Sequence, residues 1–333
     1  MTVAVVVTQP ADATTFFYQD FDDNQYGTYL QSDYIADFPG ASPTPYSMSP
    51  GWTQATGHAY TSGTSYGAGQ GLKLRAEAGQ VTSGDSGFSF RMPFDDANGQ
   101  PFSTSDIWLQ YRVKFLDGFD FQNGGKLLGI GSDGGLATGG KTVDNTSFTD
   151  YDDIGWSVRT WFDNVDDQSP DSTQGRLGLY VYHYDRPNNT GEAFDMLDGW
   201  GGSDPGYVVV DTDQWYTIQI RVVDGTPGNN DGILRAWVDG QLVFHNSSMR
   251  WGEDELNPAD ALIFNFFYGG SNPAIYGPDN DSQLVIDDIS LRSGTTSSAT
   301  VPEPATLSLL VMGWLLASRV KHGANAHQHA GFS

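Results

Sequence analysis

Apolar and polar residues alternate with a period of two in several short segments of the chain. Successive side chains of a β-strand point to opposite faces, so this period predicts strands that are buried on one side. The clearest predicted strands span residues 107–115, 156–162, 177–184, 216–223 and 284–291. A hairpin is predicted where residues 233–238 and 241–244 flank Asp239-Gly240, because this dipeptide favours a type I′ turn.

No segment before residue 300 keeps a helical period for more than two turns. Many short strands separated by turn signals predict an all-β fold, and we expect a single jelly-roll β-sandwich. Residues 131–153, 163–175 and 186–206 are predicted to be irregular, and loops of this length are often functional. The 41 glycines and 13% aromatic residues agree with a β-rich chain.

The net charge of −25 arises from 41 acidic and 16 basic residues. Nucleic-acid binding needs a basic face, so no nucleic-acid partner is predicted. Acidic polymers would also be repelled, unless the few basic residues gather in one cleft. The absence of cysteine excludes disulfides, thiolate metal sites and cysteine nucleophiles.

The C-terminal region carries a targeting pattern. A flexible linker composition at 293–300 precedes Val301-Pro302-Glu303-Pro304, an apolar run and the basic pair Arg319 and Lys321. The apolar run is shorter than the ~20 residues of a membrane span. Residues 301–333 resemble the PEP-CTERM sorting signal of Gram-negative bacteria. That resemblance implies export to the periplasm, cell surface or extracellular matrix, and transient contact with the membrane or sorting machinery.

Two further segments complete the expected organisation. Residues 1–15 contain a weakly apolar stretch without a basic region, which we interpret as a possible remnant of an export signal. Residues 16–292 are expected to form the sandwich domain.

Aspartates 20, 22 and 23 lie near the first strand, and aspartates 287 and 288 lie in the last. Pairing of these strands could assemble a structural Ca²⁺ site, with a solvated acidic surface as the alternative; no cofactor is required.

Alternation places chemically useful side chains together. Ser157, Arg159 and Trp161 share one face of a predicted strand. The tyrosines 180, 182 and 184 share a face of the next one, with His183 on the opposite side. Arg112 and Lys114 share a third face, and Lys126 follows two glycines. Arginine binds carboxylates bidentately and aromatic rings stack on sugars, so a cleft lined by these residues would suit an acidic sugar chain.

The same residue types permit β-elimination from a uronate. The carboxylate is neutralised by cations while a base removes the C5 proton and an acid protonates the leaving oxygen. Tyrosine can serve in either role when nearby cations lower its pKa. The carboxylate pattern of sandwich glycosidases, Glu-x-Asp-x-x-Glu, is absent. A glycosidase is therefore a third choice, because two scattered carboxylates would have to converge.

Several segments resemble polysaccharide lyase family 14, the alginate and glucuronan lyases. The resemblance covers about residues 85–292 and is carried by residues 113–127, 215–219, 230–240, 264–271 and 284–291. It implies a concanavalin-like jelly roll with a glove-shaped cleft for a uronate polymer.

The resemblance also implies a catalytic set. The family's lysine falls on Lys126, its Ser-x-Arg pair on Ser157 and Arg159, and its Tyr-x-Tyr pair on Tyr180 and Tyr182. Lys126 and Arg159 would hold or neutralise the carboxylate, and one tyrosine, preferably Tyr182, would be acid, base or both. The substrate-binding candidates are Arg91, Arg112, Trp161, Tyr184 and Tyr268.

Other interpretations stay open. Each of these residues could also be an ordinary strand aromatic or surface cation. The aspartates of the apparent insertion at 163–173 would repel a polyuronate. The alternative function is therefore a non-catalytic protein that binds exopolysaccharide or matrix through the same cleft.

Overall fold

The structure is a computed structural model. It describes residues 13–29, 31–41, 59–81, 87–96, 98–121, 124–132, 155–165, 173–187, 190–202, 206–253, 257–269 and 272–294. The predicted linker after residue 294, the sorting tail and most of the N-terminal segment lie outside these residues. Among the residues that are described, no helix is long and apolar enough to cross a membrane.

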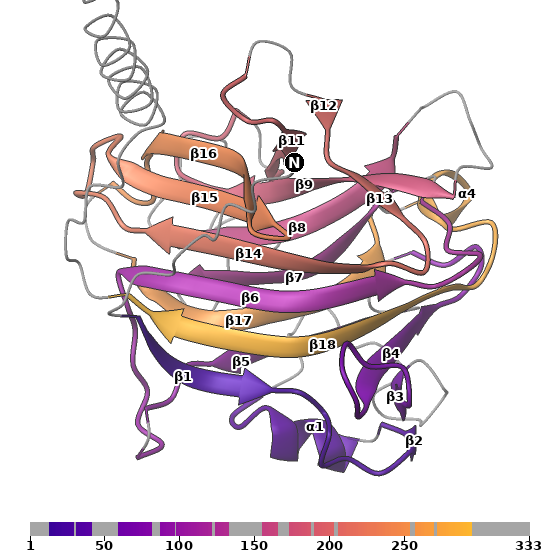
Figure 1. The fold of residues 1–333 in the computed structure, drawn as a ribbon. Helices are drawn as coiled ribbons and strands as arrows, with labels where there is room; N and C mark the ends of the chain where they lie inside the picture. Colours follow the sequence, from indigo (N-terminus) through magenta and orange to yellow (C-terminus); the bar gives the residue numbers. More distant parts are fainter. Residues whose placement is uncertain are drawn as a thin grey trace, which may run out of the picture. The chain divides into compact units, whose positions relative to one another are not determined.

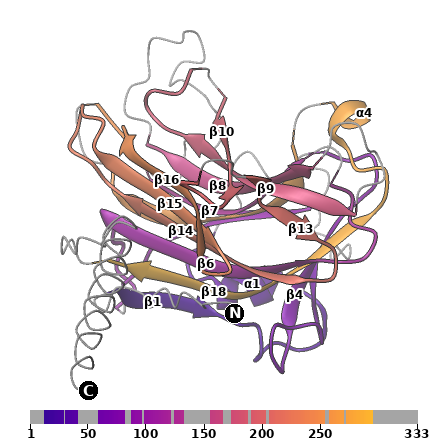
Figure 2. The ribbon, with the colours of Figure 1, turned by 45° about the horizontal axis from the view of Figure 1, so that its top comes forward.

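Two antiparallel sheets form the fold (Figures 1 and 2). Sheet A has the order β16-β15-β14-β6-β18-β4-β3-β2, with β1 also paired to β18. Its strands are β1 (Thr14–Gln19), β2 (Gly27–Thr28), β3 (Ala59–Ser62), β4 (Gly71–Ala76), β6 (Asp106–Phe115), β14 (Trp215–Val223), β15 (Gly232–Val238), β16 (Gln241–Met249) and β18 (Ser282–Ser293).

Sheet B has the order β10-β9-β8-β7-β17-β5, with β13 also paired to β9. Its strands are β5 (Phe88–Pro93), β7 (Gly125–Ser132), β8 (Ser157–Asn164), β9 (Gln174–Tyr182), β10 (Glu192–Asp195), β13 (Val209–Asp211) and β17 (Ala259–Tyr268). A small ribbon pairs β11 (Leu197–Asp198) with β12 (Gly206–Tyr207), and two short helices, α1 (Gln31–Asp37) and α4 (Pro273–Tyr276), complete the described fold.

The sequence predictions of an all-β sandwich and of its main strands are confirmed. The hairpin of β15 and β16 turns at Asp239 and Gly240, whose φ angles of 50° and 78° are the left-handed values that a type I′ turn requires. The first and last strands pair, as expected. The prediction of an irregular stretch at 186–206 is wrong, because β10 and β11 lie within it. The stretch at 163–175 is shortened by β8 and β9, and most of 131–153 lies outside the described residues.

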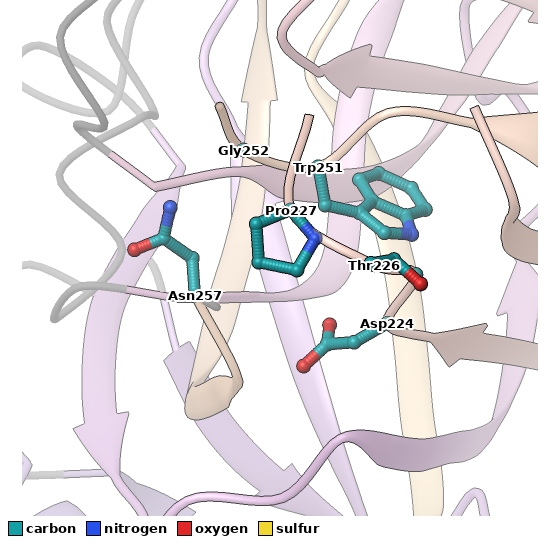
Figure 3. Close-up of a pocket in the computed structure, with 7 residues that line it drawn as sticks. Asp224, Thr226, Pro227, Trp251, Gly252 and Asn257 are labelled. Carbon is teal, nitrogen blue, oxygen red and sulfur yellow. The ribbon is translucent and has the colours of Figure 1, made fainter. Parts of the chain in front are cut away.

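A shallow hollow lies where β14 ends (Figure 3). The hollow is lined by Asp224, Gly225, Thr226, Pro227, Trp251, Gly252 and Asn257. None of the predicted site residues lines it, so the sequence prediction directs attention to the faces of the sheets instead.

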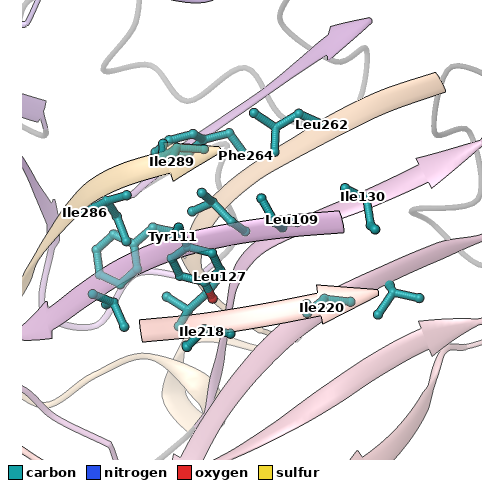
Figure 4. Close-up of a cluster of buried hydrophobic side chains, with 14 of the residues drawn as sticks. Leu109, Tyr111, Leu127, Ile130, Ile218, Ile220, Leu262, Phe264, Ile286 and Ile289 are labelled. Atoms are coloured by element: carbon teal, nitrogen blue, oxygen red, sulfur yellow. The ribbon is translucent and has the colours of Figure 1, made fainter. Parts of the chain in front are cut away.

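The hydrophobic core lies between the two sheets (Figure 4). Sheet A contributes Leu109 and Ile218, and sheet B contributes Leu127 and Phe264, all of them fully buried. Alternation along each strand sends the intervening side chains to the outer face of its sheet, the face turned away from the core. The functional candidates therefore have to be sought on these outer faces.

Candidate active site

Strand pairing brings the predicted Ser-x-Arg and Tyr-x-Tyr pairs together on the outer face of sheet B. On β8 and β9, Arg159 lies opposite Tyr180, and Ser157 lies opposite Tyr182. Their neighbours Val158 and Val181 point the other way and belong to the core. The alternation inferred from the sequence therefore holds on both strands, and the four side chains form adjacent cross-strand pairs.

Lys126 reaches the same face because β7 contains a bulge. Lys126 pairs with Trp161, and Gly129 pairs with Arg159, so three residue steps on β7 match two on β8. Without the extra residue, positions 126 and 129 would face opposite sides. The lysine Nζ lies 3.8 Å from the centroid of the Tyr180 ring. Lysine, arginine and tyrosine thus meet at one place.

Glycines make room for these large side chains. A Cβ atom on Gly129 would lie 2.6 Å from Cγ of Arg159, and one on Gly178 would lie 2.4 Å from the Trp161 ring. A Cβ atom on Gly191 would lie 2.5 Å from Cε1 of Tyr180. The arginine and the two rings therefore lie close against the backbone of their neighbours, which restricts their orientations.

Burial governs the electrostatics of the cations. Arg159 is only 4% exposed, and burial lowers the pKa of its guanidinium although the neighbouring tyrosines oppose this effect. Arginine remains charged at physiological pH even so. Burial, followed by the charge of Arg159, lowers the pKa of Lys126 to about 7, and Asp163 acts in the opposite direction. The lysine can therefore exchange a proton near neutral pH.

The two tyrosines form a hydrogen-bonded pair beside these cations. Tyr180 and Tyr182 are hydrogen-bonded to each other, and Tyr182 also bonds to Arg159. Their rings meet edge to face, with centroids 5.6 Å apart. Burial and Tyr182 raise the pKa of Tyr180 to about 12, against the influence of Arg159 and of a hydrogen bond from the Gly191 N–H. Tyr180 is therefore a protonated hydrogen-bond donor at neutral pH.

Sequence reasoning missed Arg186. This residue follows β9 in a turn and is 4% exposed, and its guanidinium lies 5.4 Å from the centroid of the Tyr182 ring. Its Nη1 donates a hydrogen bond to the carbonyl oxygen of His183 at 3.0 Å. The available signal was its position four residues after the Tyr-x-Tyr pair, where a tight turn can return a side chain to the strand.

The acidic residue that was expected to repel substrate is paired. Asp163 accepts a hydrogen bond from Nη2 of Arg176 at 3.1 Å. The Arg176 guanidinium also lies 5.4 Å from the Trp161 ring and 5.0 Å from the Tyr207 ring. Trp161 therefore lies on the predicted face, where the Arg176 guanidinium is close to its ring and to the ring of Tyr207. The remaining aspartates of the apparent insertion, at 166, 167 and 171, lie outside the described residues.

The predicted substrate-binding residues do not all lie on the same face of the molecule. Arg91 lies on the outer face of sheet B, opposite Ile263, in the same cross-strand row as Gly129 and Arg159. Tyr184 lies beyond the end of β9, where the Arg250 guanidinium lies 4.3 Å from its ring centroid, so the tyrosine row ends at Tyr182.

Two of these residues are not at the site. Arg112 lies on β6 in sheet A, where it pairs with Asp288 at 3.2 Å. Tyr268 points into the core, and its hydroxyl donates to Oγ of Ser282 at 2.8 Å. Neither side chain can contact a ligand on the outer face of sheet B. Alternation assigns residues to the two faces of a strand, but it does not show which face is buried or which sheet the strand joins.

The aspartates proposed for Ca²⁺ come close through the pairing of β1 and β18, yet they contact protein donors. Asp22 accepts from the N–H of Gln70 at 2.8 Å, and Asp288 accepts from the hydroxyl of Tyr18 at 2.7 Å. Within the described part of the chain, no group of three or more His, Cys, Asp or Glu residues is arranged to hold a metal ion. The structural Ca²⁺ site stays a prediction without geometric support.

Comparison with known proteins identifies the family. The model of the polysaccharide lyase 14 family matches residues 67–289. The chain therefore belongs to polysaccharide lyase family 14, and the resemblance noted in the sequence is confirmed. No curated protein matches the chain.

Three solved structures illustrate the shared fold. Alginate lyase Aly36B is 21% identical, covers 83% of this chain and 96% of its own, and has a TM-score of 0.61. The alginate lyase of Aplysia kurodai is 18% identical, with coverages of 84% and 99% and a TM-score of 0.59. Alginate lyase vAL-1 from Chlorella virus is 17% identical, with coverages of 70% and 88% and a TM-score of 0.52. At these identities the comparison establishes the jelly-roll fold.

Proposed function

We propose that the protein cleaves a uronate polymer of the alginate type by β-elimination on the outer face of sheet B. The observation that carries this proposal is the cluster of Lys126, Arg159, Tyr180 and Tyr182, in which a half-buried lysine and a buried arginine lie against hydrogen-bonded tyrosines. A face that only stacked sugar rings would need the aromatic residues, but it would not need the lysine and the arginine. The lysine with a pKa of about 7 adds a group that can exchange a proton.

The substrate class is supported by the relatives. Variants of Aly36B have been solved with an alginate trisaccharide and an alginate tetrasaccharide, and they share a TM-score of 0.62 with this chain. Alginate carries one carboxylate on each sugar. Such a polymer meets a chain of net charge −25, so recognition requires a local concentration of cations. Arg159 and Arg186 provide it beside the tyrosine pair.

The reaction assigns a role to each side chain. Arg159 binds the carboxylate and stabilises the charge that develops there when C5 loses its proton. Lys126, in its neutral form, accepts that proton. The electron pair forms the C4–C5 double bond as the C4–O4 bond breaks, and Tyr182 donates a proton to the departing oxygen. Tyr180 orients the sugar by hydrogen bonding. Ser157 is fully buried opposite Tyr182, so it acts on the sugar only through its neighbours.

These roles also predict a pH dependence. Activity should rise as the pH passes through about 7, because the neutral form of Lys126 then increases. The ring of Tyr180 shifts this rise in activity to higher pH, since an aromatic face favours the charged form of the lysine. A bound carboxylate would act in the same direction, so the apparent pKa in the complex should lie above that of the free enzyme.

Export would bring the enzyme to its polymer. The Pro-Glu-Pro pattern at residues 302–304 and the following apolar run support secretion through a sorting signal. We therefore place the protein in the periplasm, at the cell surface or in the extracellular matrix of a Gram-negative bacterium.

The test is the absorbance of unsaturated uronate products over time. Polymannuronate, polyguluronate, glucuronan and a neutral glucan are incubated separately with the protein, and Arg159→Ala is the matched inactive variant. A rise with an acidic polymer that disappears in the variant would support the lyase. Binding without any rise on every polymer would replace it with the exopolysaccharide-binding function.

A further inference from the structure

A second polar and aromatic surface lies on the outer face of sheet A. On strands β15, β14, β6 and β18, pairing places Arg235, Arg221, Trp108 and Arg292 at successive positions of one cross-strand row. The adjacent row contains Trp237, Gln219, Gln110 and Ser290. We call these eight residues the sheet A platform. Neighbouring strands are about 4.8 Å apart, so each row extends for roughly 15 Å.

The platform is rigid. Trp108 and Trp237 stack with ring centroids 5.1 Å apart and an interplanar angle of 18°. The Arg221 guanidinium lies 4.9 Å from the Trp108 ring and is held by two hydrogen bonds to Asp106, at 2.9 and 2.6 Å. Beneath it, Leu109 and Ile220 anchor the same strands in the core. Side chains fixed in this way lose little conformational freedom when a ligand binds.

The platform carries more positive charge than its acid neutralises. Asp106 is bound by Arg221, whereas Nη2 of Arg292 donates to the neutral amide oxygen of Gln110 at 3.1 Å. Burial and the neighbouring charge of Arg221 both lower the pKa of Arg235. Two guanidiniums therefore lie side by side in a chain of net charge −25, and an anion bound between them would relieve their repulsion.

Two hydrogen-bond donors on the platform have no acceptor within the described protein. Nε of Arg235 and Nε1 of Trp108 are buried and have no hydrogen-bond partner among the described residues. A ligand oxygen that reached these donors would form hydrogen bonds that the protein itself does not supply. Gln219 donates to Oε1 of Gln110 at 2.8 Å, which fixes two amides next to these donors. Amides suit sugar hydroxyls, and guanidiniums suit carboxylates.

We propose that the sheet A platform is a second, non-catalytic binding site for an acidic polysaccharide chain, separate from the face that carries Lys126 and Arg159. The choice of a uronate polymer as ligand rests on the proposed function. The platform lacks a lysine–tyrosine cluster of the kind found on sheet B, so it would hold the polymer without cleaving it. Its effect would be to retain the enzyme on long chains.

The experiment compares retention with turnover in the full-length protein. Mobility is measured by electrophoresis in gels that contain alginate, at one fixed ionic strength. The test variant is Arg235→Gln/Arg292→Gln, and the control is Lys73→Gln/Arg75→Gln, which removes the same charge from β4 of the same sheet. Thermal unfolding of each variant verifies that it is folded.

The platform predicts a specific pattern. The test variant should lose retention, with the apparent dissociation constant for the polymer raised at least about tenfold relative to the control variant. Its turnover of a short uronate oligosaccharide should match that of the unmodified protein. Equal retention of the test and control variants would overturn the inference. Failure of the proposed function would instead appear as absence of cleavage by the unmodified protein, which the retention assay does not measure.

Discussion

The outer faces of the two sheets carry similar residue types in different arrangements. On sheet A, Arg221 is paired with Asp106 and Arg112 with Asp288, and the tryptophans stack on each other. On sheet B, Lys126 and Arg159 lie against Tyr180 and Tyr182 instead. Cations on either face can attract an anionic polymer. Sheet B differs because its lysine has a pKa of about 7 and its tyrosines bond to each other and to an arginine.

Charge and aromatic rings favour the binding of an anionic sugar chain, whereas elimination also needs groups that exchange protons at the right position. If this distinction is correct, matched substitutions on the two sheets should affect turnover very differently.

The largest effect is expected for Arg159→Ala. Loss of the guanidinium should reduce kcat by about 10³-fold, because removal of one group that stabilises developing negative charge costs about 10²–10³-fold. Arg112→Ala on sheet A, the matched control, should retain turnover within about twofold. Initial rates of unsaturated product formation provide the measurement. Similar losses in both variants would abolish the distinction between the sheets.

Tyr182→Phe should lower kcat by about 10²-fold, in the range expected for removal of a general acid, while KM changes little. The ring and its packing stay, so only the hydroxyl is lost. Tyr18→Phe on β1 removes a hydroxyl that bonds to Asp288 and should leave kcat unchanged. If the Tyr182→Phe variant kept a normal kcat, the general acid would have to be another group.

Gly129→Ala should destabilise the fold by about 1–3 kcal/mol, the range found for overpacking. The added Cβ would lie 2.1 Å from the carbonyl oxygen of Val158 and would displace Arg159. Gly206→Ala is the control, because a Cβ there has no atom within 4 Å. Denaturant unfolding gives the two free energies. Equal values for the variants would show that β7 can accommodate a side chain beside Arg159.

The smallest effect concerns the stability of Lys126→Met. The pKa of Lys126 is about 7 in the folded protein, below its value near 10.5 in the unfolded chain. Between these values the unfolded chain binds more protons, so the stability of the unmodified protein rises with pH across this window. The variant should lack this rise and be more stable at pH 7 by about 1 kcal/mol, a figure reduced for partial exposure of the lysine.

Lys114→Met serves as the matched control on sheet A. Its Nζ pairs with Asp213 at 3.4 Å near the surface, and loss of such a pair changes stability by less than about 1 kcal/mol. Thermal unfolding between pH 6.5 and pH 10 tests both variants. A parallel pH profile for Lys126→Met and the unmodified protein would show that the lysine is not desolvated in the folded state.

The sequence predicted a large part of this arrangement. Alternation correctly placed Ser157 with Arg159 and Tyr180 with Tyr182, because β8 and β9 are regular over these residues. The family resemblance added Lys126, which a simple alternation could not place, since the bulge in β7 breaks the period between positions 126 and 129. Strand periodicity is thus sufficient where pairing is regular and fails where a strand gains a residue.

Two of the remaining errors share a physical origin. Arg112 and Tyr268 were assigned to the site from residue type and motif, yet one lies on sheet A and the other in the core. The order of strands in a sheet depends on contacts between distant segments, which local patterns do not contain. Arg186 is missed for a different reason: its contact with Tyr182 is local in the chain, but it depends on the path of the turn between them.

The bulge in β7, together with a larger irregularity in β17, has a geometric consequence for the shape of sheet B. Between the same two cross-strand rows, β8 advances two residues, from Arg159 to Trp161. β7 advances three, and β17 advances four, from Ile263 to Phe267. At about 3.3 Å per residue, β17 has roughly 7 Å more chain than β8 to fit into one span. Such an excess bends the longer strands. Curvature of the sheet beside Lys126 is thus set by the number of residues in each strand. Deletion of a single residue from β17 would reduce the curvature of the surface on which the polymer is proposed to lie, because β17 would then advance three residues against two on β8.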